Sequence, residues 1–141
     1  MLRIIDGLWI FVLGALAVPN LILAKRPDAK RLLDRIMPYQ GWIGLVSALW
    51  GLISIPHLIG ALTWLRSGRG LIAFIFLAIF VVTQTLLGFV LGIGVIKGFI
   101  KDASAQAKMD EVLAKIRPYQ ATLGLLAMAD GILIIIFWIL W

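Results

Sequence analysis

One carboxylate of this sequence lies inside an apolar segment long enough to cross a membrane. Asp130 is 12 residues after Pro118 and 11 residues before Trp141. At a rise of about 1.5 Å per residue, a helix over this segment places Asp130 near the middle of the bilayer. An aspartate costs about 2.5–3.5 kcal/mol at that depth, so it must be neutral, paired or in contact with water. We expect either a proton or ion site or a protonated group that bonds a neighbouring helix.

Gln84 is the candidate partner of Asp130. It lies 13 residues into another apolar segment, which begins at Leu71, and therefore at a similar depth. Its amide N–H groups are suited to donating a hydrogen bond to the Asp130 carboxylate. Thr83 and Thr85 flank Gln84, and we expect their hydroxyls to bond backbone carbonyls one turn back.

Two other titratable residues are weaker candidates. His57 follows Pro56, and a histidine beside a helix-distorting proline is suited to line a water path. Packing or an interfacial position is the favoured role for this single histidine. Asp6 is expected to be an interfacial carboxylate close to Arg3.

The residue types exclude several kinds of chemistry. With one histidine and no cysteine, the chain has no charge-relay pair, no thiolate ligand and no multi-histidine metal site. No phosphate-binding glycine loop of the usual form is present. We therefore expect no catalytic residues, no metal and no cofactor, and we expect that the protein is not an enzyme. A lipid-modifying enzyme is disfavoured for the same reason.

The composition is that of a membrane protein. Hydrophobic residues make up 62% of the chain and charged residues 14%, whereas a soluble domain has about a quarter of its residues charged. A soluble fold of 141 residues does not bury so much apolar surface, so lipid must cover part of it. The net charge of +6 comes from basic residues that flank the apolar segments, which indicates contact with lipid headgroups and not with nucleic acid.

These segments predict an all-α integral membrane protein with four transmembrane helices. A span needs about 20 mostly apolar residues. We expect the first segment to be retained rather than removed as a signal peptide, because its apolar run continues through Leu23 and Asp6 interrupts its start. Two connectors, 28–37 and 104–117, have the spacing of amphipathic helices. The expected spans are residues 7–24, 38–65, 71–100 and 118–141.

The sequence repeats itself. Ile36-Met37-Pro38-Tyr39-Gln40 matches Ile116-Arg117-Pro118-Tyr119-Gln120, and the match extends in both directions. We therefore predict two tandem repeats in residues 1–65 and 71–141, each a helix, an amphipathic loop helix and a helix. Each repeat crosses twice, so the two repeats are parallel. Asp130 aligns with Trp50, so the repeats differ at the candidate site.

The basic residues predict an orientation. Ten of the 13 lysines and arginines lie in or beside the two long connectors, which the positive-inside rule places in the cytoplasm. Both termini are then outside, and the location is the cytoplasmic (inner) membrane if the host is a bacterium. The residues expected to contact lipid headgroups or a docking partner are Lys30, Arg31, Arg35, Lys108, Lys115 and Arg117.

Small residues recur along the expected spans, which lets helices pack closely within or between copies. The favoured function is therefore a structural or accessory subunit that packs into a homo-oligomer or a larger membrane complex. The alternative is a homo-oligomeric ion or proton conductor, with Asp130 and Gln84 lining a pathway between subunits. The glycines expected at helix contacts are Gly44, Gly51, Gly88, Gly92, Gly124 and Gly131.

Overall fold

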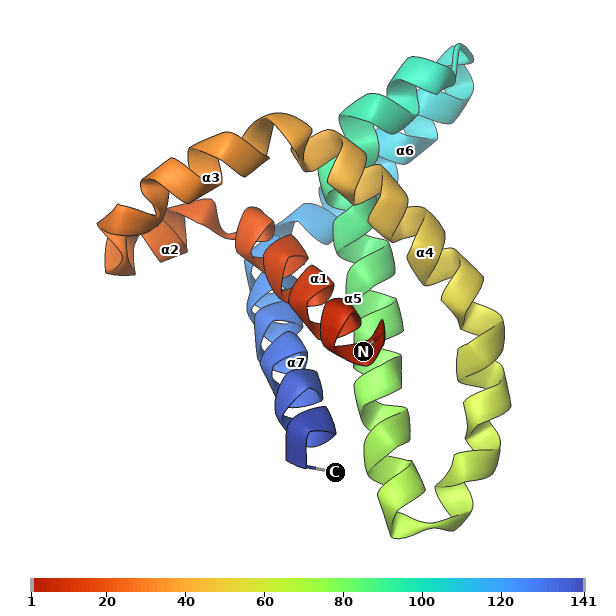
Figure 1. Ribbon diagram of the computed structural model, residues 1–141. Helices are drawn as coiled ribbons and strands as arrows, with labels where there is room; N and C mark the ends of the chain where they lie inside the picture. Colours follow the sequence, from red (N-terminus) through yellow and green to blue (C-terminus); the bar gives the residue numbers. More distant parts are fainter. Residues whose placement is uncertain (1, 141) are drawn as a thin grey trace.

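A computed structural model describes residues 2–140, and this part of the chain contains helices and no strand (Figure 1). Seven α-helices and four short 3-10 segments follow one another within it. The α-helices are α1 (Leu2–Ala17), α2 (Pro19–Lys25), α3 (Lys30–Ile36), α4 (Gln40–Gly60), α5 (Gly68–Phe99), α6 (Ala103–Ile116) and α7 (Gln120–Leu140). The 3-10 segments are η1 (Pro27–Ala29), η2 (Met37–Tyr39), η3 (Ala61–Arg66) and η4 (Arg117–Tyr119).

Three helical stretches are long and apolar enough to cross a membrane, and a bent pair of helices raises the number to four if it forms one span. The three stretches are Pro27–Arg66, Gly68–Phe99 and Ala103–Leu140. The first and third contain an amphipathic connector helix that runs on into an apolar helix through a 3-10 turn. That turn contains Pro38 in one stretch and Pro118 in the other, since proline fits the first turn of a helix.

The expected span over residues 7–24 is not one continuous helix but a bent pair. Helix α1 ends at Ala17, and α2 leaves it at an angle of 90°. Pro19 has no backbone N–H, and its ring keeps Val18 out of the helical conformation, with φ −131° and ψ 47°. At about 1.5 Å per residue, the 16 residues of α1 extend only about 24 Å, less than the hydrocarbon core of about 30 Å.

The other expected boundaries differ from the observed ones by a few residues. Helix α6 covers Ala103–Ile116, and α5 begins at Gly68, because Ser67 accepts a hydrogen bond from Gly70 as its N-cap. Helix α4 ends at Gly60 and continues as the 3-10 segment η3. The expected end of the last span, Trp141, lies outside the described residues.

The long helices form two closely packed pairs, α4 with α5 and α1 with α7. Glycines lie at both contacts: a Cβ atom added to Gly44 would be 2.3 Å from the Gly92 nitrogen, and one added to Gly14 would be 2.5 Å from the Gly124 oxygen. Backbones approach this closely only where a side chain is missing. The same holds for Gly88 against α4, Gly51 against α5 and Gly131 against α1.

The apolar core lies where α1, α5 and α7 meet (Figure 1). Ile10 and Leu13 of α1, Leu87 of α5 and Ala127 of α7 are completely buried there. Close to the core, the Gly7 backbone lies against Gly131 and Ile135, so the first turns of α1 and the last turns of α7 lie at one end of the bundle. We call this the terminal end, and the opposite end, which carries α3 and α6, the connector end.

Candidate functional site

Asp130 and Gln84 are buried inside the bundle. Asp130 of α7 is 3% exposed and Gln84 of α5 is 0% exposed, and residues of the apolar core lie within four positions of each along its own helix. The two carboxylate oxygens of Asp130 and the amide oxygen and nitrogen of Gln84 have no hydrogen-bond partner among the described residues. Most buried polar atoms in proteins have such a partner. These four atoms are therefore the principal chemical anomaly of the described chain.

The two residues lie at matching depth. The rings of Phe76 in α5 and Phe137 in α7 are in contact, with centroids 6.0 Å apart. Gln84 is eight residues further along α5, and Asp130 is seven residues back along the antiparallel α7. These steps correspond to about 12 Å and about 10.5 Å along the two helices. Gln84 and Asp130 therefore lie at nearly the same position along the axes of the two helices.

The expected hydrogen bond between Gln84 and Asp130 is wrong, since neither side chain has a partner. The close glycine contacts join α4 to α5 and α1 to α7, whereas Gln84 and Asp130 lie on α5 and α7, which belong to different close pairs. The expected bonds of the threonines are confirmed. Thr83 donates to the Ile79 oxygen and Thr85 to the Val81 oxygen, each at 2.7 Å.

A further buried polar contact was not anticipated from the sequence. Trp9 Nε1 donates a hydrogen bond of 2.9 Å to Ser47 Oγ, and Ser47 is completely buried. The Trp9 ring also lies 6.2 Å from that of Trp50, measured between centroids. The sequence does not distinguish Ser47 from the other small residues of α4, so it does not indicate this hydrogen bond.

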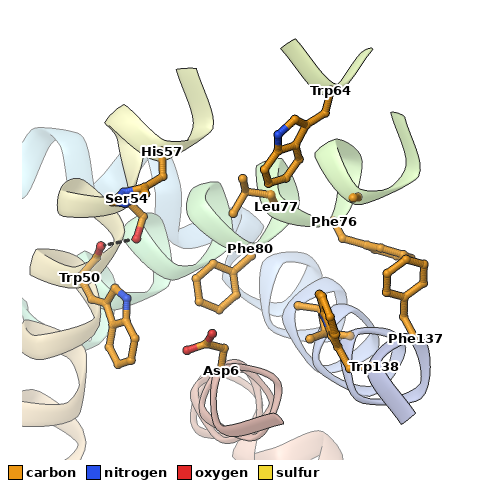
Figure 2. A pocket seen from close by; sticks show the side chains of 12 residues that line it. Asp6, Trp50, Ser54, His57, Trp64, Phe76, Leu77, Phe80, Phe137 and Trp138 are labelled. Atoms are coloured by element: carbon orange, nitrogen blue, oxygen red, sulfur yellow. Dashed lines mark hydrogen bonds between the residues drawn. The ribbon is translucent and has the colours of Figure 1, made fainter. Parts of the chain in front are cut away.

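A cavity of about 380 Å³ opens at the terminal end, and we call it the terminal cavity (Figure 2). Asp6, Ser54 and His57 supply its polar side chains. Figure 2 shows the Asp6 carboxylate beside Trp50 and below the ring of Phe80. The aromatic residues that line the cavity are Trp50, Trp64, Phe76, Phe80, Phe137 and Trp138.

The sequence carried a partial signal of the terminal cavity. Trp50, His57 and Trp64 are seven residues apart, which places them along one helical face. Asp6, which the sequence predicts to be an interfacial carboxylate, lines this cavity, and so does Trp64. His57 also lines it, with its side chain exposed.

The inner wall of the terminal cavity lies close to the buried polar pair. Phe80 and Ile134 line the cavity, and each is one helical turn from a polar residue: Phe80 from Gln84 and Ile134 from Asp130. On the connector side of the pair, Leu87 and Leu91 continue the buried face of α5. The buried faces of α5 and α7 thus connect Gln84 and Asp130 to the terminal cavity within one helical turn.

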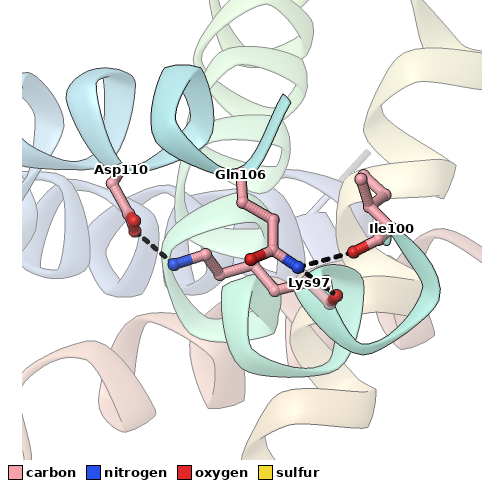
Figure 3. Close-up of polar contacts among 4 residues, drawn as sticks. All are labelled: Lys97, Ile100, Gln106 and Asp110. Atoms are coloured by element: carbon pink, nitrogen blue, oxygen red, sulfur yellow. Dashed lines mark hydrogen bonds and ion pairs between the residues drawn. The ribbon is translucent and has the colours of Figure 1, made fainter. Parts of the chain in front are cut away.

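The basic residues expected to contact lipid or a partner are all exposed at the connector end. Helix α6 is tied to the end of α5 by the Lys97–Asp110 ion pair and by Gln106 Nε2, which donates to the Ile100 oxygen at 2.6 Å (Figure 3). On α6 itself, Lys115 pairs with Glu111 at 3.4 Å. The exposed residues are Lys30, Arg31, Arg35, Lys108, Lys115 and Arg117.

No group of three or more metal-binding side chains occurs among residues 2–140.

Comparison with protein-family models, with curated proteins and with solved structures gave no match. The fold therefore defines the class of the protein: an all-helical chain with three or four helices apolar enough to span a membrane.

Proposed function

We propose that this chain is a small membrane protein that binds and exchanges a proton or a monovalent cation at Asp130 and Gln84, inside its own helix bundle. The observation that carries the proposal is that all four polar side-chain atoms of the two residues are buried without a protein partner. An unsatisfied buried polar group costs about 1–3 kcal/mol. A bound proton, cation or water satisfies these atoms and offsets that cost.

The surroundings of the pair support exchange with one side of the membrane. The terminal cavity ends one helical turn from Asp130 and Gln84, whereas apolar side chains close the connector side. Because both residues are buried within one chain, the expected pathway between subunits is not needed for access. Transport to the connector side then requires a second arrangement of the helices around the site.

We also propose that the chain is a duplication with both termini outside and the connectors in the cytoplasm. Corresponding glycines support the duplication: Gly14 aligns with Gly92 and Gly124 with Gly44, and the Gly14–Gly124 and Gly92–Gly44 pairs are both in contact. Each repeat thus contributes one helix to each close pair. The charge at the connector end supports the orientation.

A flux measurement on purified protein in liposomes tests the exchange. Under a proton, Na⁺ or K⁺ gradient, we expect flux through the natural protein and its loss in Asp130→Asn, with Gln84→Leu reduced. Asp34→Asn is the matched control, because Asp34 is an exposed carboxylate on α3. Absence of flux in the natural protein under every gradient would refute the proposal, as would full flux in Asp130→Asn.

A second candidate function is that of a structural or accessory subunit in a homo-oligomer or a larger membrane complex. Gly94 and Gly98 favour it, because they lie one turn apart on α5 and a Cβ atom added to either would meet no atom within 4 Å. The backbone of α5 is accessible there, so a helix of a neighbouring chain could pack closely against it. Native mass spectrometry should then show an assembly of several chains, and the double variant Gly94→Leu/Gly98→Leu should dissociate it. Gly60→Leu is the control and should leave the assembly intact, because Gly60 is equally open but lies on α4.

A further inference from the structure

We propose that the terminal cavity binds an organic cation, an onium ion with apolar substituents, with the Asp6 carboxylate as its counter-charge and the rings of Trp50 and Phe80 as its walls. This site is separate from Asp130 and does not depend on ion exchange there. The argument uses the composition of the cavity, its charge, its size and the contacts that hold its rings.

Aromatic rings are concentrated around this cavity. Six of the 12 side chains that line it are aromatic, whereas aromatic residues make up 11% of the chain. A cation within about 6 Å of a ring centroid is attracted by the negative face of the ring. Tryptophan gives the strongest attraction, and Trp50, Trp64 and Trp138 all line the cavity. The apolar ring surface also accommodates the substituents of an organic cation.

The charge of the cavity selects a cation over an anion. Asp6 is the one carboxylate that lines the cavity in the described part of the chain, and no lysine or arginine lines it. This contrasts with a net charge of +6 for the whole protein. Asp6 also takes part in a polar interaction within the chain, which a bound cation would share or displace. His57 is the other titratable side chain at the cavity.

Ring contacts position the cavity walls before a ligand arrives. Trp50 lies against Trp9, which is itself held by its hydrogen bond to Ser47. On the opposite wall, Phe137 contacts both Phe76 and Trp138, with centroid distances of 6.0 Å and 5.9 Å. Side chains that are already fixed lose less conformational entropy on binding.

The cavity has the size and the location that an amphipathic cation requires. Its volume of about 380 Å³ lies within the range of about 300–1,000 Å³ typical of small-molecule sites. Trp64 and His57 line the cavity and are exposed, so it is open to its surroundings. A cation that partitions into the membrane interface through its apolar groups would meet this opening.

Tetraphenylphosphonium is the probe, and tetraphenylborate, of the same shape and opposite charge, is its control. Calorimetric titration of the protein in lipid nanodiscs, corrected with empty nanodiscs, should show saturable phosphonium binding with about one site per chain. We expect Asp6→Asn to weaken it about tenfold, Trp50→Leu to weaken it severalfold, and Asp6→Glu to retain it. Trp42→Leu should leave it unchanged, since Trp42 lies at the other end of α4 against Phe99.

Equal affinity of Asp6→Asn and the natural protein would overturn the proposal, and so would equal binding of tetraphenylborate at the same site. A measurement on the natural protein does not depend on how the variants fold. His57 is the single histidine, so its ring gives one set of NMR signals. These signals should shift on addition of tetraphenylphosphonium but not of tetraphenylborate, and unchanged signals would contradict the site. Binding that survives in Asp130→Asn would distinguish this site from the proposed exchange site.

Discussion

Gln120 Nε2 donates a hydrogen bond of 3.0 Å to the backbone oxygen of Ala17, a residue 103 positions earlier in the chain. In a continuous helix that oxygen would accept from the backbone N–H of Leu21. The helix breaks at Val18, and Leu21 bonds the Val18 oxygen instead. Gln120, at the first turn of α7, therefore satisfies the carbonyl that the break before Pro19 leaves without a partner.

This relationship predicts that Gln120→Ala lowers the free energy of unfolding by about 1–3 kcal/mol, because the buried Ala17 oxygen loses its donor. Unfolding in mixed micelles of increasing denaturing-detergent content measures the change. Gln40→Ala is the matched control, since Gln40 occupies the aligned position at the first turn of α4 and no hydrogen bond of its side chain is found in residues 2–140. An equal loss in both variants would contradict this role of Gln120.

The glycine contacts predict a second, steric effect. Gly44→Val should lower the free energy of unfolding by about 1–3 kcal/mol or more, because the added Cβ atom would meet the backbone of Gly92 and Leu91, which cannot move aside. Gly60→Val on the same helix pair should change it by less than about 0.5 kcal/mol, since nothing lies within 4 Å. The same denaturation series compares the two. An unchanged free energy of unfolding in Gly44→Val would mean that the α4 and α5 backbones are further apart than the structure shows.

The buried polar pair predicts a gain in stability on its removal. Asp130→Leu and Gln84→Leu should each raise the free energy of unfolding, by at most about 1–3 kcal/mol, because each removes buried polar atoms that have no protein partner and a bound proton, cation or water offsets part of their cost. Ser47→Ala should lower it by about 1 kcal/mol, since Ser47 accepts a hydrogen bond from Trp9. If Asp130 instead held the helices together by polar bonding, Asp130→Leu would destabilise the protein as Ser47→Ala does.

The sequence predicted the depth of the site but not its contacts. Counting residues from the ends of the apolar segments placed Asp130 and Gln84 at one level, because helical rise is nearly constant. Their lack of hydrogen bonds depends on how α5 and α7 rotate and pack against each other, and residue spacing along one helix does not give that rotation. Similarly, Pro19 marks a helix break, but the residue pattern does not give the 90° angle at which α2 leaves α1.

The terminal cavity shows the same limit of sequence patterns. The spacing of Trp50 and His57 indicates one face of α4, but Asp6, Phe80 and Phe137 come from three other helices. Aromatic residues near the ends of apolar segments are typical of the membrane interface. Only the arrangement of the helices distinguishes a ring that lines a cavity from one that contacts headgroups.

The contacts of α6 predict a local effect. Gln106→Ala should speed amide hydrogen exchange in the first turns of α6, because Gln106 holds them to the carbonyls of Ile100 and Lys97 at the end of α5 (Figure 3). Global stability should fall by less than about 1 kcal/mol, since this bond is partly exposed. Lys115→Ala, which removes an exposed ion pair within α6, should leave this exchange unchanged. Unchanged exchange in Gln106→Ala would show that the Lys97–Asp110 pair alone positions α6.

The topology predicts which positions a membrane-impermeant thiol reagent reaches, and the chain is free of native cysteine. Ser67→Cys in the α4–α5 turn should react from outside, and Ser104→Cys in α6 from the cytoplasm, because α5 separates them. A cysteine added at the N-terminus should react from the Ser67 side if the bent pair of α1 and α2 crosses the membrane. Reaction from the Ser104 side would mean that three helices cross. Ser47→Cys, completely buried, is the unreactive control.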